Sequence, residues 1–120
     1  KKKLFESYLA TGGPKFNSKY KNKIFDEYVK ISNIVNAPVR KFGCASLDLA
    51  YVACGRFDGS WQWELSYWDV AASIIIVKEA GGYVDFLDLQ AKESVKRNII
   101  ATNSAIHDEL KNNILKNIIE

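Results

Sequence analysis

The sequence predicts an α/β fold, a layered domain in which helices flank a mixed five-stranded sheet. Three observations predict it. Segments that alternate with the two-residue period of strands are interleaved with segments whose apolar residues recur every three or four positions. Glycine and proline residues separate these segments. The chain has 120 residues, of which 48% are hydrophobic, so we expect one domain over residues 1–120 with a single core.

The first half of the chain predicts two strands and two helices. Residues 4–11 are compatible with a strand, which a Gly-Gly-Pro sequence ends. Residues 19–36 have the apolar spacing of an amphipathic helix, and residues 38–42 resemble a short second strand. The next helix covers residues 43–53, and Gly55 is placed to cap its C-terminus.

The second half predicts three strands and two helices. Residues 57–65 alternate as a strand, and residues 66–79 form a helix whose first residue, a serine, can cap it. This helix is apolar nearly all round, so we expect it to be buried. Residues 83–87 and 98–102 are the last two strands, and an amphipathic helix follows from about residue 104. This order of elements is typical of a sheet covered by helices.

Charge is unevenly distributed, although the net charge is only +3. Residues 1–30 carry eight lysines against three carboxylates, whereas residues 61–90 carry one lysine against five carboxylates. The acidic part contains four clustered aromatic residues, Trp61, Trp63, Tyr67 and Trp68. Nucleic-acid-binding proteins interleave cations with their stacking residues, so nucleic acid is not an expected partner. We expect the lysines to form a solvated surface and the aromatic cluster to pack in a core or interface.

The two cysteines and the length of the apolar segments indicate the cellular compartment of the protein. Cys44 and Cys54 fall at opposite ends of a predicted helix, about 15 Å apart. A disulfide needs Cα atoms within about 7 Å, so we expect free thiols and a cytoplasmic protein. The longest apolar stretch, residues 70–77, is too short to cross a bilayer, so no membrane partner is expected.

One strand-to-helix junction carries the polar residues best suited to chemistry. Asp69 falls in the first turn of the helix over residues 66–79. Ser66 and Asp69 have the spacing of a capping box, and a carboxylate near a helix N-terminus also suits the helix dipole. Spacing alone therefore favours a capping role over a metal-binding or catalytic one.

Five segments together resemble the inositol monophosphatase family. The most specific is Trp68-Asp69-Val70-Ala71-Ala72 followed by Glu79-Ala80-Gly81-Gly82, which is close to the C-terminal signature of that family. The other segments agree in order and spacing: Ala10-Thr11-Gly12-x-Pro14, residues 43–53, residues 55–59, and Ala101-Thr102-Asn103 with Ile106-His107. The resemblance extends from about Leu9 to Leu110.

The resemblance implies a fold and an activity. The fold would be the C-terminal domain of the sugar-phosphatase (inositol monophosphatase-like) fold. The activity would be Mg²⁺-dependent hydrolysis of a small phosphate monoester, with two or more ions bound. Family members are commonly homodimers, so the full-length protein is expected to be one. The chain has no methionine and begins with three lysines, so we expect it to be a piece of a longer protein. Family members are longer than this chain, and the resemblance implies that it is their C-terminal half.

The resemblance also assigns site residues. Asp69 would be a metal ligand close to the substrate, and the backbone of Gly43, Cys44 and Ala45 would lie against the substrate. The family's other metal ligands, a Glu-Glu pair and an Asp-Pro-x-Asp-Gly-Thr segment, match nothing in this chain. They are expected in the N-terminal half, which would be a partner of this domain. One carboxylate cannot hold two Mg²⁺ ions, so we expect the 120 residues alone to be inactive.

Departures from the family pattern bear on the substrate. Gln62 stands where the family commonly has a glutamate that binds substrate hydroxyls, so the resemblance implies that Gln62 lines the substrate pocket. Glutamine can still form hydrogen bonds but has no charge. Glu64, on the same strand face, is the alternative candidate for this role, although a shift of two residues along the strand moves the carboxylate by about 7 Å. Gly13 and Ser73 also differ from the pattern. Inositol phosphate, another sugar or polyol phosphate, histidinol phosphate and a nucleotide phosphate all stay open as substrates.

Weaker alternatives concern the remaining polar residues. A nucleophilic Cys44 would need a base, and His107 is the only histidine, so a packed, inert thiol is expected. His107 is expected in a capping turn or on the surface, and Asp48 and Asp58 are expected to be structural. The alternative function is a non-catalytic domain of the same fold that binds protein or RNA.

Overall fold

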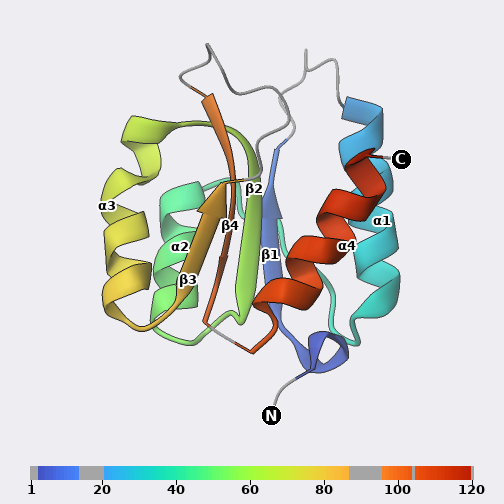
Figure 1. Cartoon of the computed structure of the whole chain (residues 1–120), viewed down its shortest axis with the longest axis horizontal. Coiled ribbons are helices and arrows are strands. Elements are labelled where there is room, and N and C mark those ends of the chain that lie inside the picture. The colour runs from blue at the N-terminus through green and yellow to red at the C-terminus, as the bar shows by residue number, and fades with distance from the viewer. Residues whose placement is uncertain (1–2, 14–20, 87–95, 104, 120) are drawn as a thin grey trace.

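The structure is a computed structural model that describes residues 3–13, 21–86, 96–103 and 105–119. One sheet lies between two pairs of helices (Figure 1). The strands are β1 (Leu9–Gly12), β2 (Gly59–Ser66), β3 (Tyr83–Phe86) and β4 (Lys96–Thr102). The helices are η1 (Leu4–Glu6, a 3₁₀ turn), α1 (Lys21–Ile34), α2 (Ala45–Ala53), α3 (Tyr67–Glu79) and α4 (His107–Ile119).

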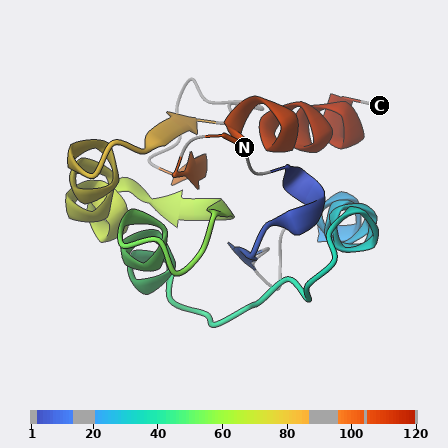
Figure 2. The ribbon, with the colours of Figure 1, turned by 90° about the horizontal axis from the view of Figure 1, so that it is seen from below.

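The helices are divided between the two faces of the sheet. Figure 2 shows α2 and α3 on one face and α1 and α4 on the other. The strand order is β1-β2-β4-β3, with β1 parallel to β2 and the other neighbours antiparallel. The prediction of a layered α/β domain with a mixed sheet is therefore confirmed. In the described part of the chain, no helix has the length and apolar character needed to cross a membrane.

The sheet has four strands rather than the predicted five. The predicted strand over residues 38–42 makes only one bridge, between Arg40 and Ala10. Arg40 donates its amide to Leu9 O at 3.0 Å and accepts from the Thr11 amide at 2.9 Å, which uses both of its backbone groups. The pairing does not extend, because Pro38 has no N–H to donate and residues 40–44 lie exposed on the surface.

Three other element boundaries differ from the prediction. The chain from residue 4 first forms η1, so the first strand is shorter than predicted and begins at Leu9. Strand β4 begins at Lys96, two residues earlier, and α4 begins at His107. The predicted cap at Gly55 is confirmed, since that glycine follows α2 with φ of 85°, a conformation that favours glycine.

The core consists of one apolar cluster on each face of the sheet. Trp61 and Trp63 are 1% and 3% exposed and pack with α1 and α4, so core packing of these two rings is confirmed. The side chains of Tyr67 and Trp68 are outside the described part. The cluster against α2 and α3 consists of Leu49, Val52, Val70, Ile74, Val77, Ile99 and Ala101.

Helix α3 is buried on one side only, which contradicts the prediction of burial all round. Val70, Ile74 and Val77 face the sheet and are buried. Ile75 and Ile76 are 61% and 51% exposed. A helix that lies on one face of a sheet has only one side to bury, so these two isoleucines form an uncovered apolar site on its outer side.

A carboxylic acid is buried in the cluster beneath α1. Glu27 of α1 is fully buried, and Trp63 Nε1 donates to its Oε1 at 3.1 Å. Its other oxygen, Oε2, has no hydrogen-bond partner. Burial raises the pKa of Glu27 to about 8, although the hydrogen bonds from Trp63 and Trp61 oppose this shift. Glu27 is therefore mostly protonated at neutral pH.

Candidate functional site

Helices α2 and α3 begin at the same end of the sheet (Figure 1). Strand β2 ends at Ser66 and leads directly into α3, so Asp69 lies in the first turn of α3 at that end. Ser73, one turn further along, donates its hydroxyl to the Ser46 carbonyl in the first turn of α2, at 3.4 Å. The N-terminal turns of the two helices are therefore neighbours.

The start of α2 is open to solvent. Cys44 is the N-cap residue and makes no side-chain capping hydrogen bond. Gly43 before it has φ of 77°, and a Cβ built there would meet no atom within 4 Å. Both residues are exposed, and Ala45 is half-buried. An uncapped helix N-terminus presents N–H groups and partial positive charge, which suit an anionic or hydroxyl-rich ligand.

Gln62 lies inside the molecule, between the sheet and α2. Its Nε2 donates to Asp48 Oδ2 at 2.8 Å and to Ser60 Oγ at 2.8 Å. Its Oε1 packs against Gly12, the residue paired with it on β1, and any side chain at Gly12 would collide with that oxygen. Gln62 is therefore joined through Asp48 to the first turn of α2, and it is 2% exposed.

Asp48 and Asp58 both make hydrogen bonds that hold the fold together, as expected of structural residues. Asp48 is buried in the first turn of α2, and its Oδ1 has no partner. Burial raises the pKa of Asp48, and the hydrogen bond from Gln62 opposes this effect. Asp58, just before β2, accepts the Tyr8 amide at 2.7 Å.

The metal-binding prediction depends on side chains outside the described part. The backbone positions of Asp69 and Glu64 are described, in α3 and β2, but their side chains are not. Among the described residues, no group of three or more His, Cys, Asp or Glu side chains can hold a metal ion. The described residues do not form a complete Mg²⁺ site, which needs several oxygen ligands.

His107 lies at the start of α4, as predicted, but not on the surface. The residue is buried, and its Nδ1 lies 2.8 Å from Thr102 Oγ1. Its Nε2 lies 2.7 Å from Asp85 Oδ2, which also accepts from Lys111 Nζ at 3.2 Å. The hydrogen bond from His107, with a smaller contribution from Lys111, lowers the pKa of Asp85. Thr102 is fully buried, so this chain of polar groups connects β3, β4 and α4 and offers no nucleophile to a substrate.

Both cysteines are free thiols, as predicted. Both are also exposed, so the expectation of a packed thiol at Cys44 is wrong. The reason is the exposed course of residues 40–44, which lead into α2 along the surface. Both ring nitrogens of His107 are engaged with Thr102 and Asp85, so this histidine is not placed to act as a base for Cys44.

Comparison with known proteins extends over nearly the whole chain. Residues 5–120 match the inositol monophosphatase family. An inositol-1-monophosphatase of Caulobacter vibrioides is 40% identical over 108 residues, which are 89% of this chain and 42% of that protein. Nus factor SuhB of Pseudomonas aeruginosa is 38% identical over 107 residues, 87% of this chain and 39% of that protein. The chain thus spans less than half the length of these relatives.

Solved structures show the same similarity in three dimensions. The inositol monophosphatase of Anabaena superposes with a TM-score of 0.81 at 37% identity. The superposition covers 95% of this chain and 45% of that protein. The strand and helix order described above, the sequence identities and the match over residues 5–120 agree with one another. On this evidence the chain belongs to the inositol monophosphatase family.

Proposed function

We propose that this chain is the C-terminal domain of a Mg²⁺-dependent phosphatase that hydrolyses a small phosphate monoester in the cytoplasm. The substrate is an inositol phosphate or a related sugar or polyol phosphate. The observation that carries the proposal is the shared end of α2 and α3, where an uncapped helix start lies beside the turn that contains Asp69. Two helix N-termini at one end favour a phosphate group electrostatically.

In this proposal the chain supplies part of the site. The backbone of Gly43, Cys44 and Ala45 contacts the substrate, and Asp69 is one oxygen ligand of Mg²⁺. When bound, the metal supplies activation of water and neutralisation of phosphoryl charge. Gln62 and Asp48 hold the first turn of α2 against the sheet, which fixes the position of the substrate-binding backbone.

The remaining metal ligands come from the N-terminal half of the same protein. The sequence of this chain has no match to the family's Glu-Glu pair or Asp-Pro-x-Asp-Gly-Thr segment, which supports a site shared between two halves. The exposed isoleucines of α3, Ile75 and Ile76, suit contact with that half, because an uncovered apolar pair on a helix favours a partner surface. The isolated chain is accordingly inactive.

The proposal is tested by two assays. The purified 120-residue chain, assayed with Mg²⁺ and inositol monophosphate, should show no turnover above the rate without protein. In a longer protein that contains this region and the upstream ligands, Asp69→Asn should remove most Mg²⁺-dependent turnover while the circular dichroism spectrum stays unchanged. Asp108→Asn, in the first turn of α4, is the matched control and should retain activity. Turnover by the isolated chain, or full activity of Asp69→Asn, would contradict the proposal.

A second candidate function is a non-catalytic domain of the same fold that contacts protein or RNA. One observation favours it. The exposed cation Lys41 lies over two aromatic rings of α1, with its Nζ 5.0 Å from the ring centre of Phe25 and 4.5 Å from that of Tyr28.

A further inference from the structure

Gln62 has no hydrogen-bond donor left for a ligand. Its Nε2 carries two hydrogens, and these go to Asp48 Oδ2 and Ser60 Oγ, each at 2.8 Å. Its Oε1 packs against Gly12, and the residue is 2% exposed. The family resemblance places Gln62 in the substrate pocket, whereas in the structure its polar atoms face the interior. An effect of Gln62 on a substrate therefore has to pass through the residues that it holds.

A bulge in β2 places an apolar residue after Gln62 on the same face of the sheet. Gln62 pairs with Ile99 and Leu65 pairs with Arg97, so β2 has one residue more than β4 between these pairs. Leu65 packs in the same cluster as Ile99, against α2 and α3. The next described side chain on the face of Gln62 is therefore apolar, and the charged partner of Gln62 comes from α2.

Asp48 lies in the first turn of α2 and depends on Gln62 for its hydrogen bonding. It is fully buried, its Oδ2 accepts from Gln62, and its Oδ1 has no partner. Its backbone N–H donates to the Cys44 carbonyl at 3.0 Å, which closes the turn. Loss of the Gln62 amide would leave a buried carboxyl without a donor, and a shift of the turn toward water would relieve that cost. Gln62 therefore fixes where the first turn of α2 lies.

The first turn of α2 is also attached to α3, but more weakly. Ser73 Oγ donates to the Ser46 carbonyl at 3.4 Å, which is long for a hydroxyl donor. The hydrogen bond between Gln62 and Asp48, at 2.8 Å, is therefore the stronger of the two attachments.

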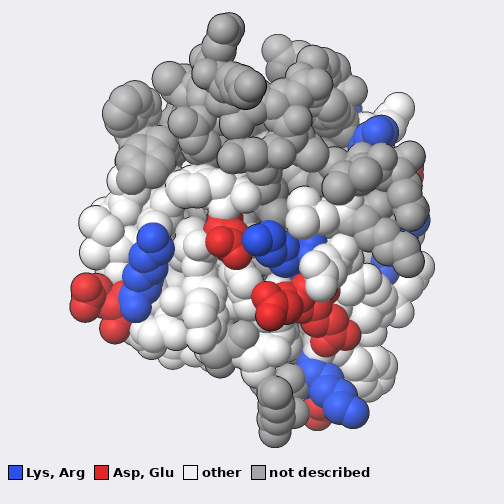
Figure 3. Space-filling model, in the orientation of Figure 1, with Lys and Arg blue, Asp and Glu red and all other residues white. Residues whose placement is uncertain are grey.

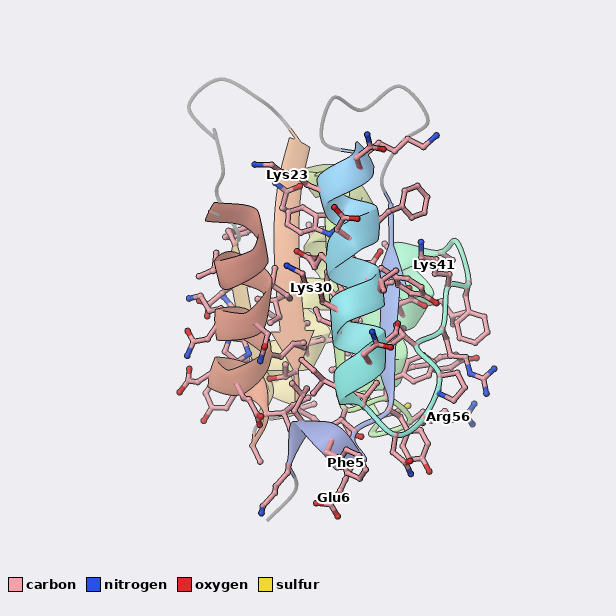
Figure 4. The ribbon with its side chains drawn as sticks, turned by 90° about the vertical axis from the view of Figure 1, so that its right-hand side faces the viewer. Phe5, Glu6, Lys23, Lys30, Lys41 and Arg56 are labelled. Atoms are coloured by element: carbon pink, nitrogen blue, oxygen red, sulfur yellow. The ribbon has the colours of Figure 1, made fainter. Side chains whose placement is uncertain are left out.

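The direction of the α2 backbone decides how well it binds an anion. An uncapped helix start offers N–H groups whose hydrogen bonds weaken steeply as their angle departs from linearity. On the face that Figure 3 shows, Lys and Arg side chains lie beside Asp and Glu side chains, so this face has no patch of one charge sign. In Figure 4, Arg56, which follows α2, lies nearer to η1 than Lys41, which precedes α2. The start of α2 and its end are therefore separate places, and Gln62 acts on the start.

We propose that Gln62 is a positioning residue, which directs the backbone N–H groups at the start of α2 through Asp48 and does not contact the substrate. This inference rests on the proposed phosphatase function. It deepens that function by assigning to Gln62 a role in substrate affinity that does not depend on recognition of substrate hydroxyls.

The first test is a double-variant cycle in the longer protein that contains this region and the upstream metal ligands. Gln62→Met keeps the length of the side chain but has no donor, so it should raise KM for inositol monophosphate by about 10-fold with little change in kcat. Asp48→Ala should have a similar effect. Because both variants break the same attachment, the double variant should be no worse than either single variant. A KM raised by about 100-fold in the double variant, or an unchanged KM in Gln62→Met, would overturn the proposal.

An exchange of the two partners is the rescue experiment. In Asp48→Asn/Gln62→Glu the asparagine amide donates to the glutamate, which restores the hydrogen bond in the reverse direction. Gln62→Glu alone should raise KM, because it sets two carboxyls against each other, and the exchange should bring KM back close to that of the unmodified protein. If the exchange left KM as high as in Gln62→Glu, the proposal would be wrong.

Asn103→Ala is the matched control for lost stability. It removes another amide hydrogen bond, from Asn103 Nδ2 to the Phe57 carbonyl at 3.1 Å, at the opposite end of β2 from α3. It should lower the stability of the protein without changing KM. An equal rise of KM in this control would mean that any destabilised variant loses affinity, and the positioning role would be refuted. Circular dichroism checks that each variant is folded.

Amide hydrogen exchange of the 120-residue chain tests the attachment without any activity. Gln62→Met should speed exchange of the Asp48 amide by about 10-fold. The Cys54 amide, which donates to the Ala50 carbonyl at 3.0 Å at the other end of α2, should exchange as before. Equal protection of the Asp48 amide in the two chains would show that Gln62 does not hold the turn.

Failure of this inference can be told from failure of the proposed function. Absence of turnover in the unmodified longer protein would contradict the phosphatase function, and this inference with it. Turnover in which Gln62→Met leaves KM unchanged would contradict only the positioning role.

Discussion

Replacing Glu27 by glutamine should remove a pH dependence from the stability of this domain. The Glu27 carboxyl is fully buried, with one oxygen bonded to Trp63 Nε1 and the other without a partner. Burial raises its pKa from 4.5 to about 8. In the glutamine variant the side-chain oxygen still accepts from Trp63, but the group no longer ionises.

The sign and size of the effect follow from proton binding. Between pH 4.5 and about 8 the folded chain holds the Glu27 proton, whereas the unfolded chain releases it. The folded state therefore binds more protons, so the free energy of unfolding falls as pH rises through this window. The slope is about 1.4 kcal/mol per pH unit, and the whole window corresponds to about 5 kcal/mol as an upper bound. That loss is comparable to the total stability of a small domain, about 5–15 kcal/mol.

Urea unfolding, followed by the fluorescence of the buried tryptophans, measures the effect at pH 5, 6, 7 and 8. Glu27→Gln and the unmodified chain should have similar stabilities at pH 5. At pH 8 the variant should be more stable by several kcal/mol. Glu79→Gln, at an exposed position of α3, is the control and should follow the unmodified chain. Parallel stability curves for Glu27→Gln and the unmodified chain would refute the buried-carboxyl argument.

Three further predictions concern other parts of the fold. Gly82→Ala should cost about 1–3 kcal/mol in urea unfolding, because its Cβ would lie 2.6 Å from the Thr102 carbonyl oxygen. Asp85→Asn should flatten the acid side of the stability profile. The pKa of Asp85 is lowered in the folded state, so its contribution is present above pH 3.8 and is lost as pH falls below that value. Gln62→Glu should destabilise the chain more at pH 8 than at pH 5, because two carboxylates within hydrogen-bond distance cannot both ionise readily. The last two predictions would be contradicted if the difference in unfolding free energy between each variant and the unmodified chain did not change with pH.

Features that depend on neighbouring residues were predictable from the sequence. The apolar stripe of α1 and the positive φ at Gly55 follow from local period and from the preference of glycine for that conformation. The burial of Trp61 and Trp63 on one face followed from alternation along β2. The family resemblance also rested on short segments with local spacing, and the match over residues 5–120 confirms it.

Features that depend on distant partners were not predictable. His107 is buried because Asp85, 22 residues earlier, accepts a hydrogen bond from it, and no pattern near His107 reveals that partner. Residues 38–42 have the composition of a strand, but only Arg40 meets β1. Gln62 lies on the face of β2 that the alternation predicts. Its burial depends on its hydrogen bond to Asp48 of α2, which the pattern along β2 does not reveal. The exposure of Ile75 and Ile76 likewise depends on which elements cover α3.

The parallel pairing of β1 with β2 has a consequence for the order of folding. Thr11 donates its hydroxyl to the carbonyl of Trp61, which lies 50 positions later in the chain, so β1 leaves the ribosome long before its partner strand is synthesised. Strand β4 follows β3 closely in the sequence and pairs with the whole of β3, from Tyr83 to Phe86. Contacts between distant segments form more slowly than contacts between near ones. We therefore expect the pairing of β1 to be a late and slow step, during which its apolar residues depend on chaperones or on η1 and α1 for cover.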